Sequence, residues 1–248
     1  MTASLRLAAP ALSLAGLIGL WAVLAAALAS PLLPGPATVW DAARAEIATG
    51  YLGHLGATLL RVAAAFAIAM SVGGAIGIAL GSSRKADRAF GTWLTLFLNL
   101  PALVTIILCY VWMGLTEVAA ITAVAINKIP NVAATLREGA RALSRDLDEM
   151  AEVYGLSWRQ RMTEVVLPQL MPFFAVAARN GLALVWKIVL VVELLGRPNG
   201  VGFMIHSHFQ LFDVAGILAY AFGFIIVVQV VEWLLLEPWE RWANRWRR

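Results

Sequence analysis

The residues best suited to recognise another molecule lie in one segment of this 248-residue sequence, residues 136–168. The segment holds eleven charged side chains, whereas charged residues make up only 14% of the whole chain. Glu149, Glu152 and Arg159 offer partners for opposite charges on another surface. Large apolar side chains lie among these charges, and such side chains anchor interfaces when they enter a pocket. They are Tyr154, Leu156 and Trp158. The segment therefore predicts a docking surface for a partner.

Capping signals divide this segment into two short helices. The first is predicted over residues 144–154, and Gly155 is placed to end it in a left-handed conformation. Ser157, with Gln160 three residues later, has the pattern of a capping box, which predicts that the second helix begins there. We expect this second helix to stop at Pro168, because proline lacks the backbone N–H that a helix interior needs.

Polar residues inside apolar stretches form a second candidate set. A charged side chain within a membrane is costly and usually faces a cavity, a partner or the membrane interface. Lys187 either helps to neutralise an anion that crosses the membrane or pairs with a neighbouring oxygen, whereas Glu193 either gates the path or caps a helix. For Arg179, pairing or an extended position toward the interface is favoured. The candidates for a translocation pathway are Asn127, Lys128, Asn131, Lys187 and Glu193.

Other kinds of chemistry are not indicated by the sequence. No G-x-x-x-x-G-K-[ST] phosphate loop is present, so the chain is not expected to hydrolyse ATP. His206 and His208 have no third ligand nearby, which makes a metal site a weak interpretation. We find no nucleophile–base set or carboxylate pair placed for catalysis, and we expect neither enzyme activity nor a bound cofactor. The net charge of +4 comes from basic residues scattered between apolar stretches, which argues against a nucleic-acid partner.

The composition requires an apolar solvent. Hydrophobic residues make up 61% of the chain, against roughly 45–50% in soluble domains, and the lipid bilayer is the usual environment for such a chain. A membrane crossing needs about 20 apolar residues in a helix. The sequence therefore predicts an all-α, polytopic integral membrane protein that forms one domain over residues 1–248, with core helices within 57–236. The six expected spans are residues 9–29, 57–81, 91–113, 116–135, 169–192 and 214–236.

The distribution of Lys and Arg predicts the orientation of these spans. With the N-terminus inside, thirteen basic residues lie in cytoplasmic segments and only Arg44 and Arg197 lie outside. Both termini and the 136–168 loop are then cytoplasmic. The first apolar segment, 9–29, is expected to remain as a helix, and a cleaved signal peptide ending near residues 27–29 is the alternative.

Two further patterns concern helix packing. Small residues recur every fourth position in the second span, which favours a close internal packing seam over a dimer interface. They are Ala65, Ala69, Gly73, Gly77 and Gly81. At the C-terminus, tryptophans alternate with arginines over residues 237–248, which predicts an amphipathic tail that anchors at the headgroup level without a protein partner.

The spacing within the loop resembles the EAA motif of ABC importer permeases, E-A-A-x3-G-x9-I-x-L-P. The matching residues are Glu149, Met150, Ala151, Gly155, Val165, Leu167 and Pro168, with Met150 and Val165 as mild departures. Much of the remaining chain is similar to permeases of the nitrate/sulfonate/taurine branch of this family. The similar segments are residues 58–62, 77–81, 100–101, 112–114, Pro130, Glu193 and 200–202.

This resemblance implies a type I ABC importer transmembrane domain in a bacterial inner membrane. In this family the loop forms a coupling helix that enters a cleft of a cytoplasmic ATPase, and ATP and Mg²⁺ bind to that ATPase. Two permease copies, here expected as a homodimer, assemble with two ATPases, and an extracytoplasmic binding protein delivers the substrate. A small anion such as an alkanesulfonate, taurine or nitrate is the expected substrate. The coupling residues implied are Glu149, Ala151, Glu152, Tyr154, Gly155, Leu156, Ser157, Trp158, Arg159, Leu167 and Pro168.

Two rival functions make different predictions. An ATP-independent channel or secondary transporter would move its substrate without an ATPase and often shows repeats between its halves, and we find no clear repeat. A membrane enzyme would place paired catalytic groups at one depth, and the sequence shows no such pair.

Overall fold

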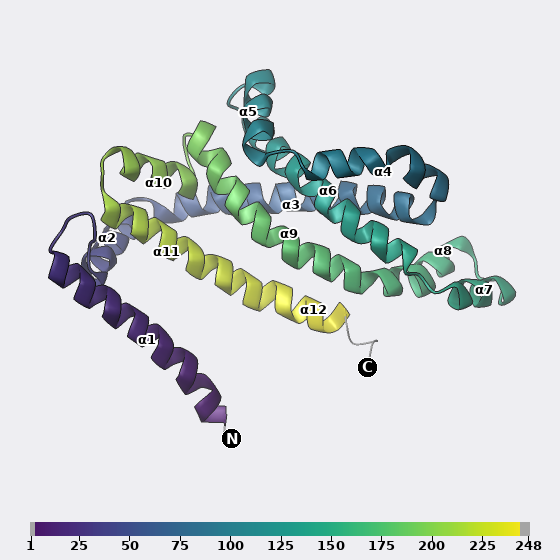
Figure 1. Cartoon of the computed structure of the whole chain (residues 1–248), viewed down its shortest axis with the longest axis horizontal. Helices are drawn as coiled ribbons and strands as arrows, with labels where there is room; N and C mark the ends of the chain where they lie inside the picture. Colours follow the sequence, from purple (N-terminus) through teal and green to yellow (C-terminus); the bar gives the residue numbers. More distant parts are fainter. Residues whose placement is uncertain (1–2, 244–248) are drawn as a thin grey trace.

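The computed structural model describes residues 3–243, with the side chains of residues 12–243, and every regular element in this part of the chain is a helix (Figure 1). Several helices run along the long axis of the molecule, with α7 and α8 at one end and α2 and α10 at the other (Figure 1). The elements are α1 (Ala3–Leu28), α2 (Pro36–Thr49), α3 (Tyr51–Ser82), α4 (Arg84–Leu98), α5 (Ala102–Met113), α6 (Glu117–Arg141), α7 (Arg145–Val153), α8 (Trp158–Gln160), the π-helical segment η1 (Arg161–Val166), α9 (Leu167–Gly196), α10 (Val201–Gln210), α11 (Val214–Val231), the π-helical segment η2 (Glu232–Leu236) and α12 (Glu237–Ala243).

Four helical stretches in the described residues are long and apolar enough to cross a membrane. A fifth crossing results if α4 and α5 together count as one bent span, and Leu12–Leu28 of α1 is a shorter apolar helix. These findings confirm the prediction of an all-helical, polytopic membrane protein. The four long stretches are Tyr51–Ser82, Glu117–Arg141, Trp158–Gly196 and Val214–Ala243.

The third predicted span, residues 91–113, is wrong as a single straight helix. Helices α4 and α5 meet at an angle of 94°, and α5 points away from the axis that α4 follows along α3 (Figure 1). The break lies at Asn99–Pro101, where Asn99 ends α4 and Pro101 takes an extended conformation before α5. Proline interrupts the helix here because it lacks an N–H and its ring restricts the residue before it.

The small residues of α3 form the expected internal seam. Ala65 and Ala69 are fully buried, and the backbone of α3 approaches α6 closely at Gly73 and Gly77. A Cβ atom on Gly77 would overlap the carbonyl oxygen of Ala133 and lie 2.9 Å from the Cβ of Leu136. Lipid supplies no hydrophobic drive between helices, so this close backbone approach is what holds α3 and α6 together.

Two short helices, α2 and α10, lie outside the predicted spans and join at one end of the molecule. The Tyr220 hydroxyl of α11 donates to Glu46 Oε2 of α2 at 3.0 Å. His208 of α10 lies 2.9 Å from Asp213 and 3.4 Å from Glu46. These contacts hold α2, α10 and the first half of α11 together. The Tyr51 ring of α3 also packs there, with its centroid 5.0 Å from that of Tyr220.

The amphipathic tail expected over residues 237–248 stays a prediction, and the structure describes it only to Ala243. Helix α12 continues α11 through η2, and Trp239 packs against the main apolar core. Glu240 pairs with Arg179 of α9 at 2.9 Å, so this segment packs against protein. The pairing that was favoured for Arg179 is thereby confirmed. Residues 244–248, which include Trp246 and Arg245, lie outside the described residues.

Candidate functional site

The first of the two predicted loop helices forms as expected. The Ser144 hydroxyl accepts from the Leu147 N–H at 3.4 Å and begins α7. Gly155 has φ of +63°, the left-handed conformation that favours glycine. The Leu156 N–H donates to the Ala151 carbonyl at 3.0 Å, as in a Schellman motif, which also has the Gly155 N–H bonded to the Glu152 carbonyl. These two hydrogen bonds satisfy carbonyl groups in the last turn of α7. The turn also sets the direction in which the chain leaves the helix.

The second helix begins as predicted but does not end as predicted. Ser157 and Gln160 form a capping box, with the Ser157 N–H donating to Gln160 Oε1 at 3.0 Å. Pro168, however, lies within a continuous helical stretch from Trp158 to Gly196. The π-helical segment Arg161–Val166 comes directly before α9, in which Pro168 is the second residue. Because the wider π turn shifts the hydrogen-bonding register, the chain accommodates Pro168 near the start of α9 without ending the helix.

The element formed by residues 144–168, hereafter the α7–α8 element, is attached to the bundle by several contacts. Arg161 of η1 forms an ion pair with Asp148 of α7, which joins its two halves. The Ser144 N–H donates to Gln169 Oε1 of α9 at 2.8 Å, and the Ala151 side chain is buried. The element is therefore fixed in shape. A cavity of about 890 Å³ separates it from the turn between α3 and α4.

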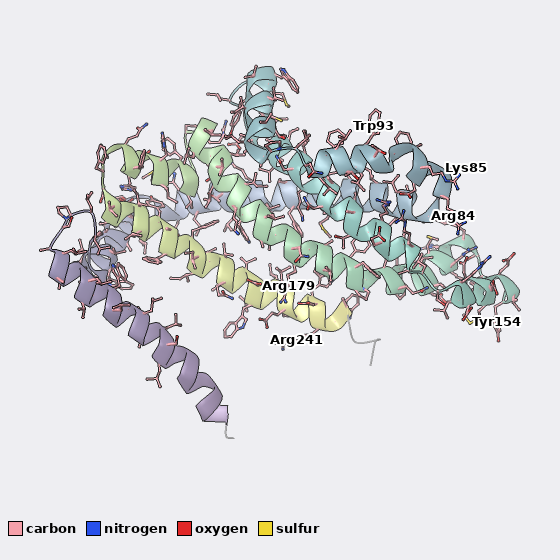
Figure 2. The ribbon with its side chains drawn as sticks, in the orientation of Figure 1. Arg84, Lys85, Trp93, Tyr154, Arg179 and Arg241 are labelled. Carbon is pink, nitrogen blue, oxygen red and sulfur yellow. The ribbon has the colours of Figure 1, made fainter. Side chains whose placement is uncertain are left out.

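The outer face of the α7–α8 element is exposed. Val153, Tyr154 and Trp158 have 85%, 77% and 78% of their surfaces accessible. Figure 2 shows Tyr154 at the far end of the molecule, at the same end as Arg84 and Lys85. The charged side chains of Glu149, Glu152 and Arg159 are also exposed. Large apolar residues surrounded by charges are the composition of a protein-binding surface.

The predicted pathway residues on α6 occupy different environments. The side chains of Asn127 and Asn131 are half-buried and donate to the carbonyls of Ala123 and Asn127 at 2.8 and 3.2 Å, so their amides bond to their own helix. Lys128 is buried, with 2% of its surface exposed. Lys187 of α9 is exposed in the single chain. The structure therefore places Lys128 inside the bundle and Lys187 on its surface.

Glu193, the remaining pathway candidate, lies in a buried charge network at the α2–α10 end. Its carboxylate is fully buried and accepts from Arg61 Nη1 at 2.7 Å, Thr58 Oγ1 at 3.0 Å and the Gly202 N–H at 2.9 Å. Such charge-assisted hydrogen bonds compensate for the water that the carboxylate has lost. Glu193 thus joins α3, α9 and the start of α10.

Arg61 links Glu193 to a second carboxylate. Its Nε and Nη2 atoms donate to both oxygens of Glu117 at 2.8 and 2.7 Å, in a bidentate arrangement. Arg197 also pairs with Glu117, at 2.6 Å, and Asn199 bonds to Arg61 through its side chain and its carbonyl. Two arginines and two glutamates therefore form a network, hereafter the Arg61–Glu193 network, whose formal charges sum to zero.

The sequence pattern identified only Glu193 of this network as a site residue. The signal that was available is topological. Arg61 lies in the first third of α3, and Glu117 is the first residue of α6. Glu193 lies near the end of α9, which runs in the opposite direction to α3 and α6. Such positions meet at one end of an antiparallel bundle. The two histidines that suggested a metal have separate partners, since His206 bonds to Gln210 whereas His208 contacts Asp213.

Comparison with known proteins shows the family to which this chain belongs. The chain is 30% identical to the putative aliphatic sulfonates transport permease protein of Escherichia coli (strain K12), over 92% of this chain and 89% of that protein. It is 25% identical to the bicarbonate transport system permease protein of Synechococcus elongatus, over 95% and 88%. A solved structure of the methionine ABC transporter in inward-facing conformations has the same fold, with a TM-score of 0.66 at 17% identity, over 78% of this chain and 94% of that one. The profile of one family, the binding-protein-dependent transport system inner membrane component, matches residues 71–236, and the chain therefore belongs to this family of ABC transport permeases.

Proposed function

We propose that the chain is the permease subunit of an ATP-driven ABC importer and that the α7–α8 element couples it to a separate ATPase. The observation that carries the proposal is the exposed and rigidly capped turn between α7 and α8, with Tyr154 and Trp158 at its surface. Two permease copies and two ATPases, with ATP and Mg²⁺ held by the ATPases, form the transporter. A binding protein delivers the substrate at the α2–α10 end.

The coupling residues act in two ways in this proposal. Exposed side chains contact the ATPase, whereas residues at the turn, at the helix caps and at the start of α9 maintain the shape of the element. The contacting set is Glu149, Glu152, Tyr154, Trp158 and Arg159. The shaping set is Ala151, Gly155, Leu156, Ser157, Leu167 and Pro168. An exposed element that is rigid before binding loses little conformational entropy on docking, which supports tight coupling.

The orientation proposed here places the α7–α8 element in the cytoplasm of a bacterium and the chain in its inner membrane. Arg84 and Lys85 lie at the same end of the molecule as Tyr154 (Figure 2). Basic loops remain on the cytoplasmic side of bacterial membranes, which supports this direction. Both termini are then cytoplasmic, and the Arg61–Glu193 network lies near the outer surface.

The proposed substrate is a small anion such as an alkanesulfonate, taurine or nitrate. The relatives named for aliphatic sulfonates and for bicarbonate support an anionic substrate.

Co-purification tests the coupling proposal directly. The chain is expressed with candidate ATPase and binding-protein subunits from the same genome. Retention of the ATPase and ATP-dependent uptake into proteoliposomes are measured. Truncation of an interface tryptophan costs about 2 kcal/mol or more, so Trp158→Ala should weaken ATPase retention by roughly 30-fold.

The matched control is Trp93→Ala, which removes another exposed tryptophan from α4 and should leave ATPase retention unchanged. If both variants retained the ATPase equally well, the α7–α8 element would not be part of the ATPase interface. Uptake by the wild-type chain without any ATPase would establish the channel or secondary transporter instead.

A further inference from the structure

Among the residues that the structure describes, Lys128 is the only buried charged residue without a hydrogen-bond or ion-pair partner. Six polar or charged residues of the described part are buried, and five of them have hydrogen-bond partners. No hydrogen bond or ion pair joins the Lys128 ammonium to any other residue that the structure describes. The five partnered residues are Thr58, Arg61, Thr105, Glu193 and His208. A buried cation without a partner is costly, and within membrane spans such residues mark pathways for ions and substrates.

The position of Lys128 is central in the bundle. It lies eleven residues from the start of α6 at Glu117 and thirteen from its end at Arg141, which is more than about 15 Å from either end. Gly181, midway along α9, lies directly against it. A Cβ atom on Gly181 would be 2.5 Å from Lys128 Cε and 3.1 Å from Nζ, and 3.6 Å from the Phe66 ring of α3. Three helices therefore surround the ammonium, and α9 has no side chain where it touches Nζ.

The protein offers this ammonium no carboxylate from the surrounding helices. Helix α3 contains no acidic residue, and the only acidic residues of α6 and α9 are Glu117, Glu138 and Glu193. Glu117 and Glu193 pair with Arg61, and Glu138 pairs with Arg141 at 3.0 Å. All three carboxylates are thus engaged at the ends of the helices, about 15 Å or more along the helix from Lys128 or Gly181. A negative charge that compensates Lys128 has to come from a molecule other than these helices.

We infer that the Lys128 ammonium is the counter-charge for the anionic group of the transported substrate, with Gly181 keeping the space beside it free. This inference rests on the proposed function and assigns the charge that its anionic substrate meets inside the bundle. The ligand class is a small singly charged oxyanion, such as a sulfonate, nitrate or bicarbonate. An anion that enters between α6 and α9 at Gly181 meets Nζ, because α9 has no side chain at that position.

The first test does not depend on the ATPase. The purified full-length chain is placed in lipid nanodiscs, and its melting temperature is measured with ethanesulfonate or nitrate at constant ionic strength in potassium gluconate. Either anion should raise the melting temperature of the wild-type chain, whereas neutral dimethyl sulfone should not. Lys128→Met should melt at a higher temperature than the wild type without anion, because it removes an uncompensated charge, and it should not respond to the anions.

The second test measures transport by the assembled complex. Lys128→Met should retain the ATPase and lose anion uptake by at least about tenfold, whereas Lys128→Arg should preserve most of the uptake. Gly181→Ala should also reduce uptake, because its methyl group displaces the flexible end of Lys128 from the site. Lys85→Met, which removes an exposed lysine from α4, is the matched control and should leave uptake unchanged.

Several results would overturn the assignment of Lys128. They are a lower melting temperature for Lys128→Met than for the wild type, an equal anion response in both chains, no anion response in the wild type, or unchanged uptake by Lys128→Met. If the wild-type chain binds no ATPase, only the coupling proposal fails. The melting measurements do not involve the ATPase and still decide the role of Lys128.

Discussion

Arg61 and Glu193 show how this protein stabilises charges within an apolar core. Both side chains are almost completely buried, and every polar atom of the Glu193 carboxylate has a donor within 3.0 Å. Arg61 uses its remaining donors on Glu117 and Asn199. Replacing a buried pair by apolar residues can be neutral, whereas removing one partner leaves the other charge uncompensated. The stability of this end of the molecule therefore depends on the complete network.

Glu193→Gln tests this dependence, because it keeps the shape of the side chain and removes its charge. We expect a loss of about 3–5 kcal/mol in the free energy of unfolding, which titration of the purified chain with denaturing detergent measures. Glu237→Gln is the control, since it removes a carboxylate whose partner, Arg241, is largely exposed. That change should cost no more than about 0.5 kcal/mol. A similar, small loss in both variants would show that the network contributes little to stability.

At the scale of elements, close backbone contact between α3 and α6 organises the bundle. Gly77 faces Ala133 and Leu136 of α6 with no room for a side chain, whereas Gly53 near the start of the same helix α3 has no neighbour within 4 Å of its Cβ position. The two glycines therefore differ in what an added methyl group would meet. At Gly77 the helices must separate, and at Gly53 nothing has to move.

Substituting each glycine by alanine distinguishes the close contact at Gly77 from the open position at Gly53. Gly77→Ala should destabilise the protein by about 1–3 kcal/mol, because overpacking displaces a rigid backbone. Gly53→Ala should stabilise it by about 0.5–1 kcal/mol, because alanine restricts the unfolded chain and favours the helix. Melting temperatures of the two variants in the same nanodiscs provide the measurement. Opposite signs are expected, and stabilisation by Gly77→Ala would disprove the close packing of α3 on α6.

At the scale of the whole molecule, the two ends are chemically different. The end with α7 and α8 carries Arg84, Lys85 and the exposed aromatic residues of the α7–α8 element (Figure 2). The other end carries the neutral Arg61–Glu193 network and the exposed apolar turn at Leu211 and Phe212. This asymmetry fits an ATPase at one end and a binding protein at the other, which requires one orientation in the membrane.

Cysteine labelling tests that orientation. The single Cys109 is buried, so Cys109→Ala provides a cysteine-free background. On intact spheroplasts, a membrane-impermeant maleimide should label Leu211→Cys and should label Lys85→Cys only after permeabilisation. Both positions are exposed, so accessibility to the reagent differs only through the membrane. Labelling of Lys85→Cys on intact spheroplasts would reverse the proposed orientation.

Local features of this protein were predictable from the sequence by itself. The capping box of Ser157 and Gln160 and the left-handed turn at Gly155 involve residues only a few positions apart, so sequence spacing determines their geometry. The helical spans follow in the same way from long apolar stretches, because a lipid environment requires that the backbone be hydrogen-bonded within each helix. The same reasoning identified the segment proposed to dock the ATPase.

Only the tertiary structure decided which distant residues meet. Arg61 and Glu193 are 132 positions apart, and nothing in local spacing pairs them. Two prolines show the same limit, since Pro101 breaks a span at 94° whereas Pro168 continues a helix after a π-helical segment. Their different outcomes follow from the backbone before each proline, which is extended at Pro101 and π-helical before Pro168. That Lys128 has no partner is likewise decided by the tertiary structure. It follows only once the carboxylates of α6 and α9 are placed, each paired with an arginine far from Lys128.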